Sequence, residues 1–453
     1  MKRLLYVPLV ISMMMGISSC SNDQPTFDAP EVSINNLSGE YEMPQSDEIR
    51  LKAVIKSSSK STFKWYVGGV AQATTDSVFV FTTDRIGEHV VSLKCINEGG
   101  EKEATAQISV YGKYRHGTFI LNEGNMTSEN GTLIFISPKG QITDSVYIKT
   151  NNKTLGNVTQ DLFIKNGKMY IISQNGKKNT PNMESEGMLV VANAETLKHL
   201  ATYDEELKKT LSWPTHIAVV NDNNLFIRDN KGVYAFDPAT KKLTFVKGSE
   251  GALKNRMAVV GNKVFVPGKK QILVLEAGKT EVTQTIELNA TISGVIKSAD
   301  NNVWVSVLKT SDKKDRIIKI KAADGTIIKE NEISEGSVNA GWGATPGITA
   351  IGNTIYFSGT TTSIYRHNFE TGDTKLMVDA STLVQDANIV YNNIAVNPKT
   401  GHVYINTLKG FGLDFLKNSI ALLDFSGTAP KLHKEYRDYT NFPAGIFFTY
   451  DFN

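Results

Sequence analysis

A short strand–turn–strand unit recurs through most of the chain, and this repeat limits the possible folds more than any other feature. In each copy an apolar run is followed by a tight turn of Asn, Asp or Gly, and then by a second run with an aromatic residue at a fixed place. The copies span residues 162–172, 217–227, 257–266, 295–305, 348–357 and 394–405. Such turns favour β-hairpins, because Asn, Asp and Gly tolerate a positive φ. Hairpins repeated every 40 to 50 residues or so predict an array of β-sheets.

Each hairpin is followed by a third apolar run, and then by a polar turn and a fourth run. The third runs lie at residues 188–191, 233–236, 272–275, 317–320, 364–367 and 420–423. Four strands per unit is typical of a β-propeller blade. The ends supply one more unit, because residues 445–450 resemble a first strand and residues 118–121 a second, with runs at 133–136 and 144–148 after them. This predicts an all-β fold with a seven-bladed β-propeller over residues 113–453, closed so that no sheet edge is exposed.

The first residues have the features of an export signal. Lys2 and Arg3 precede an apolar run that stops just before Cys20. The run is shorter than the roughly 20 residues that a membrane-spanning helix needs. We therefore expect a signal peptide over residues 1–19, lipid on Cys20 and a linker over residues 20–29, giving a surface-exposed outer-membrane lipoprotein. The alternative is a cleaved signal with an incidental cysteine.

Residues 30–112 have a pattern of their own, in which short runs alternate apolar and polar residues between Gly and Ser turns. This pattern is typical of a small antiparallel sandwich. Trp65 has the position of a core tryptophan, and residues 82–89 resemble a turn of a PKD-like domain. Cys95 alternates with Leu93 on the expected inner face, which predicts a buried thiol. We expect an Ig-like or PKD-like β-sandwich ahead of the propeller.

Three connections between second and third strands are longer than most, at residues 123–130, 174–187 and 407–419. In a propeller these loops lie on the same face as the loops that enter the first strands. Because the ring closes, their blades are neighbours, and the loops should form one continuous wall. Long loops in a compact domain are usually functional or disordered. The opposite face carries short polar turns, and we expect it to be plain solvated surface.

The loops that enter the first strands are rich in aromatic, amide and charged residues. With the wall, they give the candidate ligand-binding residues Glu123, Asn125, Asp161, Trp213, His216, Asn255, Arg256, Trp342, Asn392 and Phe411. Aromatic faces supply affinity for an amphipathic ligand, and amides and charges orient it. The alternative is that Trp213 and Trp342 only fill space between blades. His216 could also pair with Asp161 across adjacent blades.

Little in the sequence points to a metal, a cofactor or catalysis. The seven histidines show no metal-ligand spacing, and no serine or cysteine lies in a nucleophile motif. The runs at residues 222–224 and 300–302 fit hairpin turns better than calcium loops. A formal net charge of +3 gives no basic surface for nucleic acid. We predict a binding protein without metal or cofactor, and a lyase or hydrolase on a propeller scaffold is the weakest alternative.

Residues 115–453 resemble the YncE-like, DUF5074-type propeller surface lipoproteins of Bacteroidetes. The segments that carry the resemblance are residues 119–125 and 155–161 and the starts of later blades at Pro214 and residues 255–256. Some relatives of this type capture cobalamin for a TonB-dependent transporter, and others accompany glycan uptake. The resemblance thus implies a corrinoid or glycan ligand, or an outer-membrane transporter as partner, with the membrane reached only through the lipid. The N-terminal sandwich is a departure from the cobalamin-capturing relatives. An adhesion or scaffold protein with contacts through its rim is the alternative.

Overall fold

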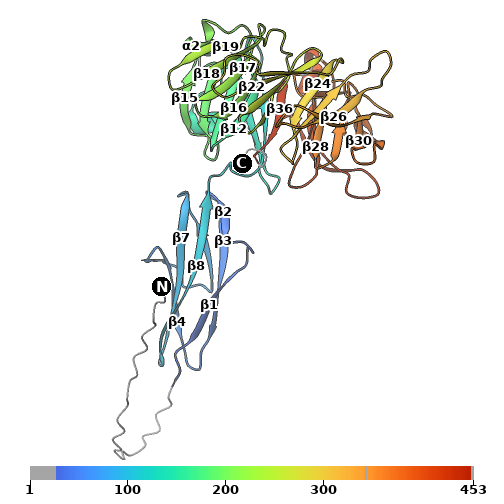
Figure 1. Cartoon of the computed structure of the whole chain (residues 1–453). Helices are drawn as coiled ribbons and strands as arrows, with labels where there is room; N and C mark the ends of the chain where they lie inside the picture. Colours follow the sequence, from blue (N-terminus) through green and yellow to red (C-terminus); the bar gives the residue numbers. More distant parts are fainter. Residues whose placement is uncertain (1–26, 342–343, 450–453) are drawn as a thin grey trace, which may run out of the picture. The chain divides into compact units, whose positions relative to one another are not determined.

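The chain folds into two compact units, of which the first ends at Tyr111 and the second begins at Gly112. The computed structural model describes residues 27–341 and 344–449. In the described residues both units consist of β-strands joined by loops, and the second unit also has short helical turns (Figure 1). Within the described ranges, no helix is long and apolar enough to cross a membrane.

The first unit is a sandwich of two sheets. One sheet has the order β1-β3-β6 and the other the order β2-β8-β7-β4-β5. The strands are β1 (Glu31–Asn36), β2 (Glu42–Pro44), β3 (Glu48–Lys56), β4 (Thr62–Val67), β5 (Val70–Ala71), β6 (Val78–Thr82), β7 (Gly87–Asn97) and β8 (Gly100–Tyr111). Trp65 and Cys95 are fully buried, which confirms both predictions. The Trp65 indole stacks on Phe79 and donates to the carbonyl of Asp76 at 3.0 Å, so its polar atom is satisfied inside the core.

The second unit contains, among the described residues, seven four-stranded sheets in a propeller-like arrangement. The first sheet combines β36 (Pro443–Phe448) with β9 (Thr118–Asn122), β10 (Thr132–Ile136) and β11 (Ile142–Thr143). The second holds β12 (Asn157–Lys165), β13 (Lys168–Gly176), β14 (Leu189–Asn193) and β15 (His199–Tyr203). The third holds β16 (His216–Asn221), β17 (Asn224–Arg228), β18 (Val233–Asp237) and β19 (Lys242–Phe245).

The remaining sheets repeat the same order of strands. They consist of β20 (Ala258–Val260), β21 (Lys263–Pro267), β22 (Gln271–Glu276) and β23 (Gln284–Glu287); β24 (Ile292–Lys297), β25 (Val303–Val307), β26 (Arg316–Ile320) and β27 (Ile327–Glu332); β28 (Thr349–Ile351), β29 (Thr354–Phe357), β30 (Ser363–Asn368) and β31 (Thr374–Asp379); and β32 (Ile389–Val396), β33 (Val403–Leu408), β34 (Asn418–Asp424) and β35 (Lys431–Arg437). The inner strands touch their neighbours, as β36 with β12, β12 with β16 and β32 with β36. They therefore surround a common centre.

Two-residue turns join the first two strands in four of the six complete repeats, and longer turns do so at residues 298–302 and 397–402. Between β12 and β13 only Asn166 and Gly167 separate the paired residues Lys165 and Lys168. Both turn residues have a left-handed backbone, with φ of 51° and 70°. A two-residue Asn-Gly turn of this kind has a twist that matches the flanking strands, which is why the recurring turns identified the hairpins.

The last strand pairs with the first strand of the unit, as the sequence predicted. In this antiparallel pairing Ile446 lies opposite Ile120 and Phe447 opposite Phe119. The pairing gives the first sheet its inner strand from the opposite end of the chain. It also buries Phe447 in a cluster that reaches into the second sheet.

The prediction of a strand at residues 144–148 is wrong. The strand β11 ends at Thr143, Ser145 adopts a left-handed backbone, and a short helix α1 (Val146–Asn151) follows. Neighbouring residues of a strand point to opposite faces, whereas Val146 and Tyr147 are both buried against the same core cluster. A helical turn places two adjacent apolar side chains against one core. The other helical turns are α2 (Glu205–Lys208), η1 (Ala380–Thr382) and η2 (Gly412–Leu416).

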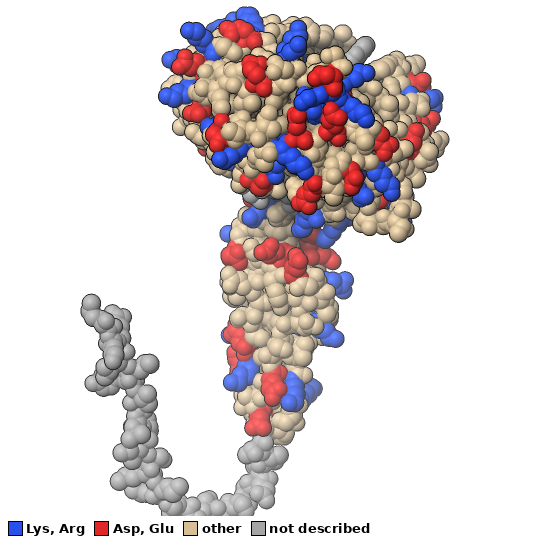
Figure 2. Space-filling view, turned by 45° about the vertical axis from the view of Figure 1, so that its right-hand side comes forward, with Lys and Arg blue, Asp and Glu red and all other residues tan. Residues whose placement is uncertain are grey.

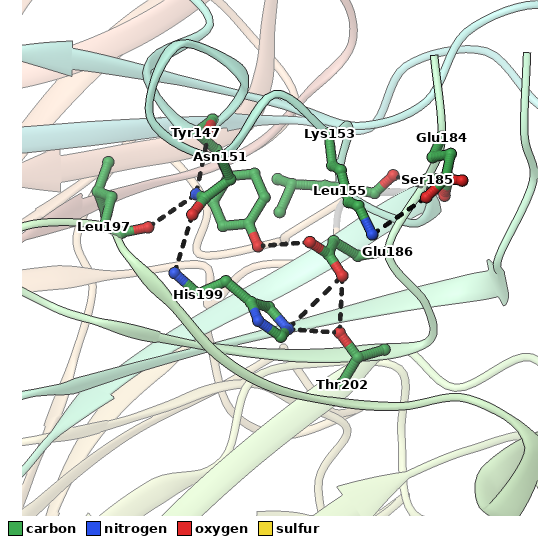
Figure 3. A network of polar contacts seen from close by, with 10 residues as sticks. All are labelled: Tyr147, Asn151, Lys153, Leu155, Glu184, Ser185, Glu186, Leu197, His199 and Thr202. Atoms are coloured by element: carbon green, nitrogen blue, oxygen red, sulfur yellow. Dashed lines mark hydrogen bonds and ion pairs between the residues drawn. The ribbon is translucent and has the colours of Figure 1, made fainter.

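A polar network fixes α1 to the second sheet (Figure 3). The Tyr147 hydroxyl donates to the buried carboxylate of Glu186 at 3.3 Å, and Thr202 donates to the same carboxylate at 2.9 Å. The side chain of Asn151 donates to the carbonyl of Leu197 at 2.8 Å and accepts from the backbone N–H of His199 at 2.9 Å. The Asn151 bonds thus satisfy the backbone carbonyl of Leu197 and the backbone N–H of His199, which have no neighbouring strand to pair with on that side within the described residues.

We predict that Phe447→Asp destabilises the second unit by at least about 3 kcal/mol, because it places an unpaired charge in the core that joins the two ends. Chemical denaturation followed by tryptophan fluorescence measures the change. Phe411→Asp is the matched control, since Phe411 is 62% exposed and should change stability little. Similar midpoints for the wild-type protein and Phe447→Asp would contradict the role given to this strand.

Candidate functional site

Equivalent positions at the start of the inner strands define the site. In each of the seven described sheets, the aromatic residue of the second strand is paired with a residue of the inner strand. The position two residues before that inner-strand partner is the equivalent one in every sheet. From the first sheet to the seventh, this position is occupied by Gly445, Asp161, His216, Arg256, Gly294, Gly347 and Asn393. Because the sheets repeat one geometry, these positions lie at the same level around the centre.

Two of these positions are joined by a buried ion pair. The Arg256 Nε donates to the Asp161 carboxylate at 3.0 Å, and the other carboxylate oxygen accepts from the Ile217 N–H at 3.2 Å. The guanidinium of Arg256 also lies over the Phe447 ring, 4.1 Å from its centre. A Cβ at Gly445 would lie only 1.8 Å from Arg256 Nη2. Arg256 therefore reaches from the fourth sheet to the first, and glycine at position 445 leaves the space it needs.

Burial dominates the electrostatics of this pair. It raises the pKa of Asp161 to about 6, although the charge of Arg256 and the N–H groups of Ile217 and Leu162 act in the opposite direction. Burial also lowers the pKa of Arg256, which stays cationic. Perturbed titration in a converging cluster is a physical mark of a functional site.

His216 does not pair with Asp161, contrary to the hypothesis from the sequence. Its Nε2 lies 2.6 Å from the carbonyl of Ala344, so Nε2 carries the proton, and Nδ1 lies 2.9 Å from the Thr215 hydroxyl. Burial, with the nearby charge of Arg256, holds the pKa of His216 well below its ordinary range. The imidazole is therefore neutral and its two nitrogens are both engaged.

Two asparagines complete the polar layer. The Asn255 amide donates to the carbonyls of Ser293 and Thr345, each at 3.1 Å. The side chain of Asn392 accepts from the Ala344 N–H at 3.2 Å and donates to a carbonyl of β36. Residues 344 and 345 thus connect the sixth sheet to the third, fourth and seventh, and they cover the centre at this level.

Glu123 lies beside this layer. Its backbone N–H donates to the carbonyl of Phe442 at 2.8 Å. Burial raises the pKa of its carboxyl group to about 6, with opposite contributions from Lys254 and from hydrogen bonds to Gln160 and Asn392. Glu123 is therefore, after Asp161, a second carboxyl group near the centre whose pKa is raised.

The long loops are neighbours, as predicted. The Asn130 amide donates to the carbonyl of Lys178 at 2.8 Å, and the Lys178 ammonium donates to the carbonyl of Thr127 at 2.9 Å. The third loop reaches the first through Phe442, whose ring stacks on Phe415 with ring centres 4.5 Å apart and whose carbonyl accepts from the Glu123 N–H. Asn125 has a local role, since its side chain accepts from Thr127 within the first loop.

The first three sheets each have a strained residue at the same position of the loop or strand that leads to the centre. This position lies five residues before the inner-strand residue that pairs with the aromatic of the second strand. Phe442, Val158 and Trp213 have φ of 52°, 57° and 54° there. A left-handed backbone costs a non-glycine residue about 1–2 kcal/mol, and more for β-branched Val158. Such strain persists only where the surroundings impose it, and it gathers at functional sites.

The structure corrects the expected exposed rim. Asp161, His216, Asn255 and Asn392 are buried, because the inner strands converge so closely that these side chains meet one another instead of solvent. Trp213 is 50% and Phe411 62% exposed, so they remain on the surface. Trp213 therefore does not fill a space between sheets. Cys20 and Trp342 lie outside the described residues.

A cavity of about 620 Å³ occupies the centre of the second unit, next to the polar layer. At one end it is lined by the buried residues Asp161 and Asn392 and by Arg256. At the other end its lining residues are exposed and lie at the hairpin turns, among them Gly261, Lys297, Ala299 and Gly352. The cavity therefore opens on the face that we expected to be plain solvated surface.

Sequence reasoning missed several residues of this site. Gly445 could have been found from the sequence, because it precedes the inner-strand partner of the second-strand aromatic by two residues, as Asp161, Arg256 and His216 do in their own repeats. The lysines at the open end, Lys165 and Lys297, gave no signal, because polar residues in hairpin turns are ordinary.

The charged residues of the visible surface do not gather by sign. Figure 2 shows Lys and Arg interspersed with Asp and Glu over the visible face of the second unit. Within the part of the chain that the structure describes, no group of three or more His, Cys, Asp or Glu side chains could hold a metal ion.

We predict that Asp161→Asn destabilises the protein by about 3–5 kcal/mol, because it leaves the mostly buried Arg256 without a counter-charge. The double variant Asp161→Leu with Arg256→Met removes both charges and should recover most of that loss. Glu184→Gln is the control, since the Lys153–Glu184 pair is solvent-exposed and worth less than about 1 kcal/mol. Denaturant titration measures all three, and equal effects of Asp161→Asn and Glu184→Gln would refute the analysis.

A second prediction concerns pH. The folded protein holds the Glu123 proton up to about pH 6, whereas the unfolded chain releases it near the ordinary value of 4.5. Stability from the protonated carboxyl is therefore lost as the pH rises from 4.5 to 6. Glu123→Gln lacks this titration, so the wild-type Tm should fall relative to that of the variant across the window. Asp161 titrates in both the wild-type protein and the variant, so its contribution cancels in the difference between their Tm values. Parallel Tm curves would show that Glu123 is not perturbed.

Comparison with known proteins agrees with the fold. A solved structure from Bacteroides thetaiotaomicron, a quinonprotein alcohol dehydrogenase-like protein, is similar with a TM-score of 0.54 and 16% identity, over 92% of this chain and 99% of that chain. A protein of unknown function from the same species has a TM-score of 0.34 and 12% identity, over 86% and 96% of the two chains. The identity of 16% to the first of these structures shows similarity of fold alone.

No curated protein matches the chain significantly in sequence. The family model described as a domain of unknown function, DUF5074, matches residues 116–449. This match spans the second unit almost completely and covers well over half of the chain. The chain therefore belongs to the DUF5074 family.

Proposed function

We propose that the protein is a cell-envelope lipoprotein, acylated at Cys20, that binds a small molecule inside its second unit. The central cavity of about 620 Å³ carries this proposal, because pockets for small molecules measure roughly 300–1,000 Å³. In this proposal the seven sheets are the blades of a closed β-propeller. The first unit is an Ig-like or PKD-like spacer between the lipid and the propeller.

A binding role suits the polar layer better than catalysis does. Asp161 is occupied by Arg256, and both nitrogens of His216 are engaged by Thr215 and Ala344. A general base or nucleophile needs a free position toward its substrate. The layer instead resembles a rigid polar support, which keeps a binding cavity in shape.

Nutrient capture at the outer surface, with a TonB-dependent transporter as partner, is the setting that the sequence resemblance favours. The cavity can enclose a ligand of modest size. A corrinoid is larger than this cavity and would have to lie on the face formed by the long loops. A glycan could use either place.

Native mass spectrometry of the full chain, and calorimetric titration with cobalamin and a panel of oligosaccharides, test the proposal. Ala395→Trp fills the cavity from its wall and should weaken binding more than tenfold. Ala429→Trp is the matched control, because Ala429 is exposed and lies away from the cavity. Binding that withstands Ala395→Trp would move the site out of the cavity, and the absence of any ligand would overturn the proposal.

An adhesion or scaffold role is the second candidate, and exposed apolar side chains on one loop favour it. Phe411, Leu413 and Leu416 are 62%, 84% and 55% exposed in and next to η2. Apolar surface of this kind marks contact sites for other macromolecules. Loss of an envelope partner on replacing Leu413 by Ser, with cavity binding absent, would favour this role.

A further inference from the structure

Most of the residues that line the central cavity are apolar, and apolar atoms form about half of its surface. The side chains of Phe163, Val259, Ile296, Ala350 and Ala395 line it and are partly exposed. These residues lie on innermost strands, so the surface they expose faces the cavity. A ligand body that covers them gains about 25 cal/mol for each Å² of apolar surface removed from water. The walls therefore favour an apolar body.

The polar groups at the closed end are largely engaged with one another. The Arg256 guanidinium is held by Asp161 and covered by Phe447 and Gly445. Its Nη2 is buried without a hydrogen-bond partner, and the Arg256 side chain, 22% exposed, lines the cavity. The Asn392 amide bonds to the Ala344 N–H and to β36. At this end the charge of Arg256 is thus already balanced by Asp161.

The open end is cationic. The ionisable residues that line the cavity are Asp161, Lys165, Arg256 and Lys297. Asp161 and Arg256 neutralise each other, which leaves the charges of the two lysines near the opening. Lys297 is exposed there and Lys165 is half-buried.

Two acidic residues of the hairpin turns are paired with other lysines. Asp222 pairs with Lys168 at 2.7 Å, and Asp300 pairs with Lys319 at 2.8 Å. In the described residues neither Lys165 nor Lys297 forms an ion pair with an acidic side chain. The opening therefore carries uncompensated positive charge next to an apolar interior.

We infer that the cavity takes an amphipathic anion, whose apolar body lies against the inner strands and whose anionic end group lies at Lys165 and Lys297. The ligand enters from the hairpin-turn face, opposite the long loops. This inference rests on the proposed function, because it names the class of ligand for the same cavity. Carboxylates and phosphate esters share the chemistry that the two lysines recognise.

Calorimetric titration of the full chain with octanoate, octyl phosphate and 1-octanol tests this assignment. We expect the anions to bind at least tenfold more tightly than the alcohol, which has the same chain without the charge. Lys165→Met with Lys297→Met should remove this preference and leave the binding of octanol unchanged. Lys270→Met is the matched control, because Lys270 is exposed and does not line the cavity. Ala395→Trp should abolish binding of all three probes.

The outcomes separate the inference from the proposed function. Equal affinity for octanol and the anions, or a preference that survives the double lysine variant, would overturn the charge assignment while the cavity remained a binding site. Failure of all three probes, with cobalamin or a glycan still bound, would overturn the inference and leave the proposed binding function standing. Preference for one anion over the other identifies the end group as carboxylate or phosphate.

Discussion

The hydrogen bonds between β36 and β9 join the two ends of the second unit, and the other inner strands are arranged around that joint. Phe447, paired opposite Phe119, packs into the core shared with the second sheet and lies under the guanidinium of Arg256. The strand that closes the unit is thus also part of its polar layer. Glycine at position 445 serves both purposes, because any side chain there would displace Arg256.

The polar layer and the cavity are consequences of the same convergence. Seven inner strands crowd together at one level, where polar side chains find partners in other side chains and in backbone groups, as Asp161 does in Arg256 and His216 in the carbonyl of Ala344. An unpaired polar group at such a depth costs free energy, and most groups there are engaged, with the Asn255 Oδ1 and the Arg256 Nη2 as exceptions. Next to this layer the inner strands carry smaller or partly exposed apolar residues such as Ala350 and Ala395, and the space between them is left open.

This arrangement separates rigidity from binding. Charged and amide groups that a sequence suggests as ligand contacts are used to hold the inner strands in place, and the raised pKa values of Asp161 and Glu123 reflect the burial that this role demands. The cavity beside these groups is lined mostly by apolar residues, with Lys165 and Lys297 toward its opening.

The sequence by itself determined the repeat of hairpins, the pairing of the last strand with residues 118–122, the burial of Trp65 and Cys95, and the proximity of the long loops. These follow from patterns of neighbouring residues and from the need to satisfy backbone hydrogen bonds. The tertiary structure decided that residues 146–151 form a helix, that Asp161 pairs with Arg256 instead of His216, and that the cavity opens on the hairpin-turn face. Those outcomes depend on distances across the centre between residues far apart in the chain, and local sequence patterns do not encode such distances.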